Sequence, residues 1–313
     1  MGMVESTRKA YGEALCAAGE NERVVVFDAD LAACNMTSYF ARQYPERFYN
    51  VGIAECNMAG IAAGVASCGK IPFINSFAMF AAGRIYDQIR NSICYPRLNV
   101  KIVGTHAGLN VGEDGATHQC LEDLSLMRSI PNMTVICPCD SYETKAAVHA
   151  MVEYDGPCYL RLGRSPVEMV VPEVEGYHFE LGKGVQLAEG NDVTIIAVGH
   201  MVRVALDAAR KLEKENIRVR VIDMHTVKPI DREMIRKAAM ETGAIVTTEE
   251  HSVIGGLGSA VAEVVGETKA VPVIRHGVQD VFGHSGTVDA LMERYGLTEE
   301  KLIEKVRTAI AAK

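Results

Sequence analysis

The sequence has no excess of basic residues. Its 32 Lys and Arg are outnumbered by 40 Asp and Glu, which gives a formal net charge of -8 at pH 7. The electrostatic footprint of a nucleic-acid-binding protein is therefore missing. The sequence also has no long apolar run free of polar residues and no signal-peptide pattern near residue 1, which argues against a membrane span and a secretion signal. We expect a cytoplasmic protein that binds neither nucleic acid nor membrane.

Paired cysteine motifs are missing as well. The nine cysteines are spread singly, apart from Cys137 and Cys139, and no pair of CxxC motifs occurs. This pattern predicts reduced thiols in a cytosolic chain and no structural zinc site. A metal or redox role for Cys137 and Cys139 is the alternative.

In the first half of the chain, short apolar runs alternate with longer helical patterns. The runs typical of strands are VVVFDA from residue 24, FYNVG from 48, IPFINS from 71, NVKIVGT from 99, MTVICP from 133 and PCYLRL from 157. Helical periodicity covers 55–67, 81–93 and 141–154, and Asp140 and Ser141 are candidate caps for the last helix. Strands that alternate with helices predict a parallel sheet with helices on both faces.

The second half shows the same alternation, although its sequence does not repeat the first half. Its apolar runs are DVTIIAVG from 192, IRVRVID from 217, AIVTTEE from 244 and VPVIRHG from 271, with helical patterns from 202, 231 and 259. Residues 165–191 are rich in Pro, Gly and Glu and lack helical periodicity. We predict an α/β protein with two open, mainly parallel sheets, each covered by helices, in domains 1–174 and 192–313 joined by a linker at 175–191.

One acidic residue lies in a segment that is otherwise free of charge. Between Arg47 and Lys70, in RFYNVGIAECNMAGIAAGVASCGK, the only charged side chain is Glu55. Burying an ionised carboxylate without a partner is unfavourable, so such a group is usually paired, protonated or functional. Glu55 is therefore the first candidate functional residue.

A polar, glycine-rich segment is the second candidate. Residues 105–123, THAGLNVGEDGATHQCLED, follow a predicted strand and precede a predicted helix, which is where ligands bind in open α/β sheets. The segment contains His106, Glu113, Asp114 and His118, but their spacing matches no metal-binding motif. The pattern indicates a substrate-binding loop, and an ordinary solvated loop is the alternative.

Two other segments are less specific indicators of a ligand-binding site. Residues 73–97 bring Phe77, Phe80 and Arg84 into one stretch, and such an aromatic stripe belongs either to the core or to a ligand platform. The glycines of GGLG at 255–258 precede a helical pattern but lack the third glycine of the dinucleotide fingerprint. We predict a tight strand-to-helix turn there rather than an NAD site.

Together, these segments resemble the transketolase family. The residues STRKAYGEAL, FDADL, GIAE, SFAMFAAGRIYDQIR, GTHAGLNVGEDGATHQCLEDL, MRSIPNMTV and LRLGR, in that order, are similar to the pyrimidine-binding and C-terminal domains of transketolase. The resemblance covers essentially the whole chain, and GEDGATHQ with GIAE upstream is its most specific part. It implies the thiamine diphosphate-binding fold and the transfer of a two-carbon ketol unit between sugar phosphates.

The resemblance also implies roles for individual residues. Glu55 matches the glutamate that bonds N1′ of the aminopyrimidine of thiamine diphosphate and thereby promotes proton removal from the cofactor. His118 matches a catalytic histidine close to the reacting carbonyl of the substrate. Four residues match cofactor-binding positions: Asp30, Phe77, Phe80 and Arg84. His106 and Arg164 match residues that bind the substrate phosphate, and Asp114 matches a residue that binds a substrate hydroxyl.

The chain also departs from the family pattern. Ile74 stands where some transketolases have an aromatic residue, and Cys34 where some have a phosphate-contacting serine. No GDG motif occurs, although thiamine diphosphate enzymes hold the diphosphate through a divalent cation with GDG and a later Asn. We therefore expect no metal ligand in this chain. A partner chain with GDG and Asn should bring the diphosphate and Mg²⁺ or Ca²⁺, in an assembly of two copies of each chain.

Three rival interpretations remain. A 1-deoxyxylulose-5-phosphate synthase shares several of these residues, but His106 in THAG favours transketolase. The beta chain of a 2-oxo-acid dehydrogenase is of similar size, but it is not expected to contain GEDGATHQ. A non-catalytic chain with the same fold is disfavoured because Glu55, His106, Asp114 and His118 are all retained.

Overall fold

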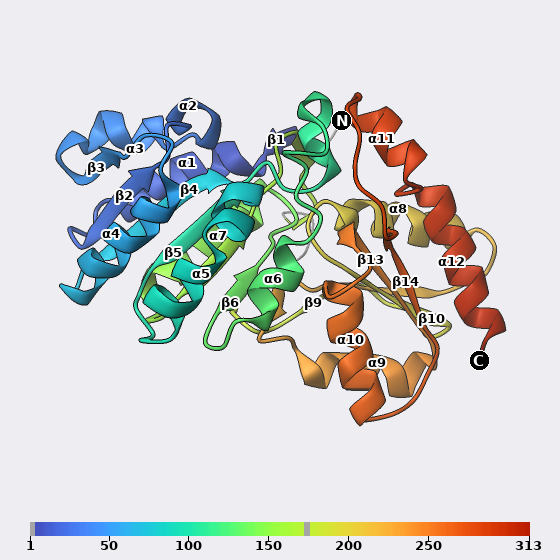
Figure 1. The fold of residues 1–313 in the computed structure, drawn as a ribbon. Coiled ribbons are helices and arrows are strands. Elements are labelled where there is room, and N and C mark those ends of the chain that lie inside the picture. The colour runs from blue at the N-terminus through green and yellow to red at the C-terminus, as the bar shows by residue number, and fades with distance from the viewer. Residues whose placement is uncertain (1–3, 172–175) are drawn as a thin grey trace.

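The computed structural model describes residues 4–171 and 176–313, and these form two α/β units that lie side by side (Figure 1). We call residues 4–171 the first unit and residues 176–313 the second unit. The predicted domain boundary at residue 174 lies outside the described residues. In the described part of the chain, no helix is long and apolar enough to cross a membrane.

The first unit is built on a seven-stranded sheet with the order β12-β6-β7-β5-β4-β2-β3. Its strands are β2 (Val24–Asp28), β3 (Phe48–Asn50), β4 (Ile71–Phe77), β5 (Lys101–Thr105), β6 (Thr134–Ile136), β7 (Cys158–Arg161) and β12 (Thr226–Lys228). All six strands predicted for this half are present, and they pair in parallel. The antiparallel strand β12 comes from the second unit.

Helices cover both faces of this sheet. One face carries α1 (Thr7–Ala18), α3 (Ser38–Gln43) and α7 (Ser141–Glu153), and the other carries α4 (Glu55–Ser67) and α6 (Asp123–Ser129). The two cores use alternate residues of β2, because successive side chains of a strand point to opposite faces. Asp140 caps α7, as predicted, and its side chain accepts a hydrogen bond from the backbone N–H of Glu143.

The predicted helix 81–93 differs from expectation. It consists of two π-helical segments, η2 (Met79–Arg84) and η3 (Ile89–Cys94), with the single turn α5 (Tyr86–Gln88) between them. π-helical turns are rare and often accompany functional sites. The remaining short elements of the first unit are α2 (Ala32–Asn35), η1 (Pro45–Arg47), η4 (Leu109–Asp114) and the antiparallel pair of β1 (Val4–Ser6) and β8 (Pro166–Glu168).

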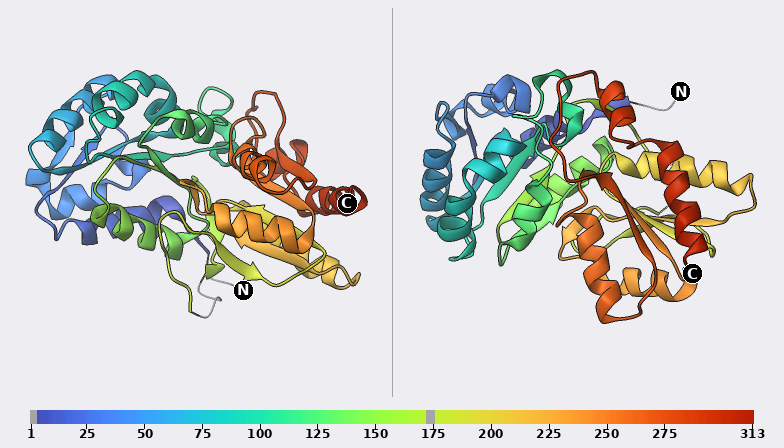
Figure 2. Two further views of the ribbon diagram at one scale, coloured as in Figure 1. Left: turned by 90° about the horizontal axis from the view of Figure 1, so that it is seen from below. Right: turned by 45° about the vertical axis from the view of Figure 1, so that its right-hand side comes forward.

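The second unit has a five-stranded sheet with the order β14-β13-β10-β11-β9. Its strands are β9 (Val185–Ala188), β10 (Val193–Ala197), β11 (Val219–Asp223), β13 (Ile245–Ser252) and β14 (Val273–Val278), and all pair in parallel except β9. The helices are α8 (Met201–Glu213), α9 (Arg232–Thr242), α10 (Leu257–Glu267), α11 (Val288–Arg294) and α12 (Glu299–Ala311). Helices α8 and α12 cover one face, and α9 and α10 the other (Figure 2). The predicted fold class, two open and mainly parallel sheets covered by helices, is confirmed.

Two strands lie where the sequence did not predict them, and one of them joins the two units. Strand β9 lies within the segment that we assigned to the linker, and β12 leaves the second unit to extend the first sheet beside β6. One hydrophobic cluster continues from α4 and α6 of the first unit to α9 and α10 of the second. The two sheets therefore share a core across the junction.

Candidate active site

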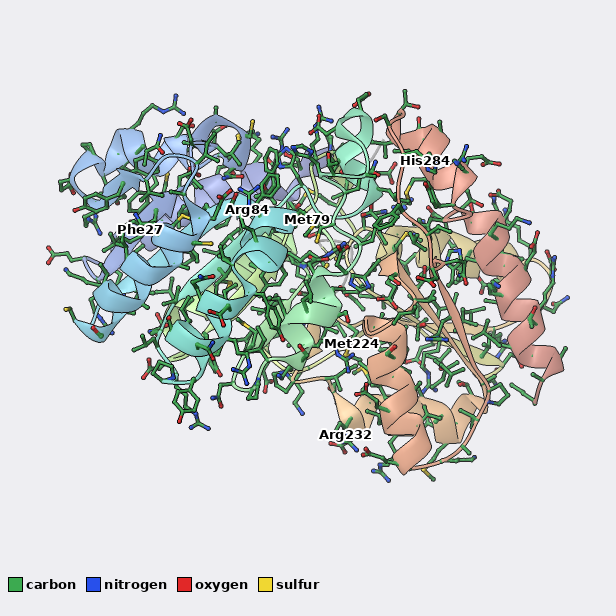
Figure 3. The ribbon with its side chains drawn as sticks, in the orientation of Figure 1. Phe27, Met79, Arg84, Met224, Arg232 and His284 are labelled. Atoms are coloured by element: carbon green, nitrogen blue, oxygen red, sulfur yellow. The ribbon has the colours of Figure 1, made fainter. Side chains whose placement is uncertain are left out.

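Glu55 is buried and forms an ion pair with Arg84. It is the first residue of α4 and is only 2% exposed. Its carboxylate accepts a hydrogen bond from Arg84 Nη1 at 2.7 Å and one from Ser76 Oγ at 3.3 Å. The N-terminus of a helix and a guanidinium group both stabilise a negative charge, which explains how this carboxylate can be buried in an apolar segment. Arg84 itself stays 43% exposed at the end of η2 (Figure 3).

Four rings assemble beside this ion pair. The guanidinium of Arg84 lies 4.2 Å from the ring centroid of Phe80, and the Phe80 ring stacks near that of Phe77. His106 stacks on Phe77 with a centroid distance of 3.9 Å, and His118 meets the edges of both phenylalanines. The aromatic stripe of β4 and η2 is thus a platform that continues directly from the carboxylate of Glu55. Six of the predicted site residues are connected in this way.

His106 is held in a neutral state by its surroundings. Burial, followed by the positive charges of Arg8 and Arg164, lowers the pKa of His106 to about 3. Its Nδ1 lies 2.8 Å from Thr105 Oγ1, and that hydroxyl donates to Asn35 Oδ1. Since the hydroxyl hydrogen of Thr105 is already used, Nδ1 of His106 must be the donor, which leaves Nε2 as an acceptor.

Two arginines meet beside His106. Arg8 Nε donates to the backbone oxygen of Arg164 at 3.0 Å, and Arg8 Nη1 donates to the backbone oxygen of Cys34 at 2.8 Å. Arg164 Nη1 reaches Glu113 Oε2 at 3.2 Å. Burial and the charge of Arg164 lower the pKa of Arg8 from its ordinary value. Guanidinium groups suit an anion such as a phosphate, and the charges of both arginines act on His106.

Arg8 is a site residue that the sequence analysis did not single out. It lies in STRKAYGEAL, the first segment of the family resemblance, and that position was the available signal. Asp30 and Asp114 lie apart from the cluster and are exposed. Asp30 accepts a hydrogen bond from Asn50 Nδ2, whereas the side chain of Asp114 makes no hydrogen bond or ion pair with any residue within 4–171 or 176–313.

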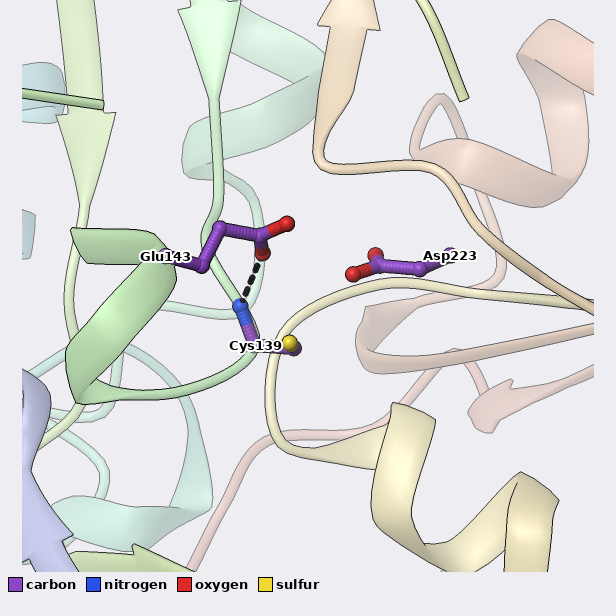
Figure 4. Close-up of side chains that lie close together, drawn as sticks. All are labelled: Cys139, Glu143 and Asp223. Carbon is purple, nitrogen blue, oxygen red and sulfur yellow. Dashed lines mark hydrogen bonds between the residues drawn. The ribbon is translucent and has the colours of Figure 1, made fainter. Parts of the chain in front are cut away.

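A second group of polar side chains lies at the junction of the two units, away from the aromatic platform. Cys139, Glu143 and Asp223 bring a thiol and two carboxyl groups within 4.8 Å of one another, and all three residues are buried (Figure 4). Burial, followed by the charge of Glu143, raises the pKa of Asp223 well above its ordinary value. Neither oxygen of the Asp223 carboxyl group has a hydrogen-bond partner among the described residues, whereas Glu143 accepts hydrogen bonds from the backbone N–H of Cys139 and from the hydroxyl of Tyr177. Cys139 is one of the two cysteines for which a metal or redox role is the alternative to a reduced structural thiol.

The GGLG segment forms the predicted tight turn. Gly255 has φ of 79°, a backbone conformation that favours glycine. A Cβ atom on Gly256 would lie 2.0 Å from Glu249 Oε2. Glu249 instead fills this space and accepts hydrogen bonds from the backbone N–H groups of Leu257 and Gly258, both at 2.7 Å, at the start of α10. The glycines therefore make room for a buried carboxylate cap.

Comparisons with known proteins identify the family of this fold. The family model described as transketolase, pyrimidine binding domain, matches residues 5–169, and the model described as transketolase, C-terminal domain, matches residues 182–302. The chain therefore belongs to the transketolase family. Within that family it corresponds to the pyrimidine-binding and C-terminal domains, so the predicted resemblance is confirmed.

Three similar proteins match the chain over most of their length. A protein named putative transketolase C-terminal section, from Methanocaldococcus jannaschii, is 48% identical over 97% of this chain and 96% of its own length. The 6-deoxy-6-sulfo-D-fructose transketolase subunit SqwH of Clostridium sp. is also 48% identical, over 91% of this chain and 88% of its own. A solved structure titled split gene transketolase, inactive beta4 tetramer, has a TM-score of 0.91 and 55% identity, and the match covers 98% of this chain and 99% of that one.

Proposed function

We propose that this chain is the C-terminal subunit of a thiamine diphosphate-dependent transketolase, which transfers a two-carbon ketol unit from a ketose to an aldose phosphate. The observation that carries this proposal is the buried carboxylate of Glu55 next to the platform of Phe77 and Phe80. The neutral His106 stacks on Phe77, and the positive charges of Arg8 and Arg164 lie near His106. One wall of the site thus combines an acceptor for a ring nitrogen, flat apolar surface and an anion site.

The residues present fit the pyrimidine end of thiamine diphosphate. A carboxylate that is 2% exposed, yet bonded to an arginine that is 43% exposed, can exchange part of its contacts for a bound heterocycle. The rings of Phe77 and Phe80 lie next to each other and would line the heterocycle, and we assign the exposed Asp30 and the guanidinium of Arg84 to the same ligand. When bound, thiamine diphosphate supplies a nucleophilic carbon that carries the two-carbon unit. Glu55 would hold a proton between its carboxylate and the ring nitrogen of the cofactor in a site shielded from water.

On the substrate side, we assign the terminal anionic group to Arg8 and Arg164. Two planar guanidinium groups bind phosphate oxygens with good geometry. Nε2 of His106 would accept a hydrogen from a substrate hydroxyl or from a protonated phosphate oxygen. Asp114 and His118 would bind hydroxyl and carbonyl groups nearer the cofactor, since they lie in the same loop as His106. His118 is the residue of this chain that we place closest to the reacting carbonyl.

The diphosphate and its cation require residues that this chain does not supply, since it contains no GDG motif. We propose that a partner subunit with GDG and Asn binds the diphosphate and Mg²⁺ or Ca²⁺ and that the assembly is α2β2. The names of two relatives, a C-terminal section and a split-gene transketolase, support a division of this kind. A cytoplasmic enzyme of sugar-phosphate metabolism, such as the pentose phosphate pathway, fits these features.

A sugar sulfonate is the alternative to a sugar phosphate as the anionic substrate. One relative with 48% identity is named for 6-deoxy-6-sulfo-D-fructose, in which a sulfonate stands at the end of the sugar. Arg8 and Arg164 would bind a sulfonate by the same hydrogen bonds as a phosphate. We favour phosphate because the second ionisation of a phosphate gives a higher negative charge opposite two guanidinium groups.

The test is a reconstitution. The chain is co-purified with partner candidates that contain GDG and Asn, and ketol transfer is measured with thiamine diphosphate and Mg²⁺. Transfer from xylulose 5-phosphate to ribose 5-phosphate supports the proposal. A higher kcat/KM with 6-deoxy-6-sulfofructose as donor would assign the sulfonate substrate instead. Condensation of pyruvate with glyceraldehyde 3-phosphate would identify a synthase, and full activity of the chain without a partner would contradict the split.

A further inference from the structure

We infer that Glu250, from the second unit, is a positioning residue that holds the substrate loop of the first unit in its working conformation. The substrate loop is residues 105–119. Glu250 lies in β13 and is only 3% exposed. Its Oε1 accepts a hydrogen bond from the backbone N–H of Asn110 at 2.5 Å, across 140 residues of sequence. The kinetic consequences of this inference rest on the function proposed above.

Glu250 contacts the substrate loop at two places and is itself held on two sides. Gly108 has φ of 76°, and a Cβ atom there would lie 2.4 Å from Cδ of Glu250, so the loop backbone approaches this carboxylate as closely as glycine allows. The other oxygen, Oε2, lies 3.1 Å from Nδ1 of His200, just before α8. The backbone oxygen of Glu250 accepts from Arg161 Nη2 at 2.8 Å.

The contact with Asn110 connects Glu250 to the anion site. The side-chain oxygen of Asn110 accepts hydrogen bonds from the backbone N–H groups of Arg164, at 3.0 Å, and Ser165, at 2.6 Å. The guanidinium of Arg164 in turn donates to the backbone oxygen of Val111 at 2.5 Å. A displacement of Asn110 would therefore move both the loop and the backbone that carries Arg164.

The second unit also holds the far end of the substrate loop. Gln119 Nε2 donates to the backbone oxygen of His284 at 2.9 Å, and Leu109 packs in a buried cluster with Leu291 and Val278 of the second unit. His118 is the neighbour of Gln119. The second unit thus contacts the loop on both sides of Asp114, and the carboxylate of Glu250 is the charged group among these contacts.

This inference assigns a role in substrate binding to a unit that supplies no residue to the platform of Phe77 and Phe80. Loss of Glu250 should release the backbone N–H of Asn110 and loosen the group that binds phosphate. The effect should be largest for substrates that carry a phosphate, because Arg164 moves with Asn110. It should be small for an acceptor without phosphate.

The test compares Glu250→Ala with Glu250→Gln, which keeps an oxygen for the N–H of Asn110. The control is Glu263→Ala, since Glu263 is exposed on α10 and its carboxylate contacts Arg128 rather than the loop. Hydrogen exchange is measured first on the purified full chain. We expect faster exchange at the Asn110 amide, confined to peptides from 105–119 and 164–165, in Glu250→Ala, and recovery in Glu250→Gln. Unchanged exchange there, or equally fast exchange throughout both units, would overturn the inference whether or not the chain is a transketolase subunit.

The kinetic part uses the reconstituted enzyme with ribose 5-phosphate and glycolaldehyde as alternative acceptors. Glu250→Ala should raise KM for ribose 5-phosphate about tenfold, the change expected from about 1.4 kcal/mol of lost binding, with a smaller change in kcat. KM for glycolaldehyde should stay close to that of Glu263→Ala. An equal loss with both acceptors would contradict a role at the phosphate. If the wild-type pair shows no ketol transfer, the proposed function fails, while hydrogen exchange still decides the positioning role.

Discussion

Two buried glutamates, Glu55 and Glu249, show how the same side chain can serve different purposes in one molecule. Both lie at the N-terminus of a helix, Glu55 at α4 and Glu249 at α10. Glu249 has no exposed surface, and its two oxygens are bonded to backbone N–H groups. Glu55 is bonded to two side chains, and one of them, Arg84, is partly in solvent.

The two glutamates differ in whether a ligand could replace their hydrogen-bond partners. Backbone N–H groups of a helix cannot leave Glu249 without unfolding of the first turn, so this carboxylate is a structural cap. The side chain of Arg84 is partly in solvent and can rotate away from Glu55, which would free the carboxylate for a ligand. A buried carboxylate with a replaceable partner therefore indicates a binding site, whereas one with fixed backbone partners indicates a fold determinant.

The largest expected effect separates the two glutamates by activity. In the reconstituted enzyme, Glu55→Gln should lower kcat of ketol transfer by about 10²- to 10⁴-fold, because it removes the proton acceptor at the cofactor. Glu249→Gln should leave kcat close to the wild-type value, since Glu249 caps the first turn of α10 and lies next to His251 rather than at the platform. Initial rates at saturating cofactor measure both. Near wild-type activity of Glu55→Gln would remove the proposed role of this residue.

The second prediction concerns stability, for which Glu249 rather than Glu55 should be the important residue. Glu249→Ala leaves the backbone N–H groups of Leu257 and Gly258 without acceptors, and should lower the free energy of unfolding by about 2–4 kcal/mol. The exposed control Glu263→Ala should change it by less than about 0.5 kcal/mol. Urea denaturation followed by circular dichroism measures the difference. Equal stability of the two variants would mean that Glu249 is not a cap.

The third prediction concerns pH. Burial raises the pKa of Glu249 to about 7. Because the folded state holds this proton more tightly than the unfolded chain does, the stabilising contribution is complete below pH 4.5 and is lost as the pH rises from 4.5 to 7. The loss should be at most about 3 kcal/mol. The stability of the wild type minus that of Glu249→Gln should fall over this interval, and a constant difference would contradict the raised pKa.

The smallest expected effect is that of replacing Arg84, the partner of Glu55, on stability. Arg84→Lys keeps a positive charge beside Glu55 but loses the planar group over Phe80, so it should change the free energy of unfolding by less than about 1 kcal/mol. Thermal unfolding of the chain without cofactor is sufficient to measure this. A loss as large as that of Glu249→Ala would show that the pair of Glu55 and Arg84 is a structural ion pair, and the comparison between the two glutamates would then fail.

The sequence predicted those parts of the molecule that depend on local patterns. The six strands of the first sheet were predicted because each is a short apolar run between helical segments. Strands β9 and β12 were not, since VQLA and TVK are short and become strands only through neighbours far away in the chain. The two π-helical segments were also missed, because the apolar pattern of 81–93 does not distinguish them from an α-helix.

The candidate site shows the same division. The pattern of residues 73–97 left core and ligand platform as alternatives, and only the family resemblance assigned Phe77, Phe80 and Arg84 to cofactor binding. The contact of Asn110 with Glu250 joins residues 140 positions apart, and no local sequence pattern predicts such a contact. Asp30 and Asp114, assigned through the family resemblance, are exposed in the isolated chain, so their roles in binding stay predictions.

The strand β12 has a consequence for any attempt to divide this protein. It covers the edge of β6 in the first sheet, although it belongs in sequence to the second half. A chain cut after residue 191 would lose β12 and present the backbone groups of β6 to solvent, where they can pair with another molecule. Truncations made at the linker should therefore precipitate rather than yield an independent pyrimidine-binding fragment. The two halves should therefore be expressed and engineered as one piece.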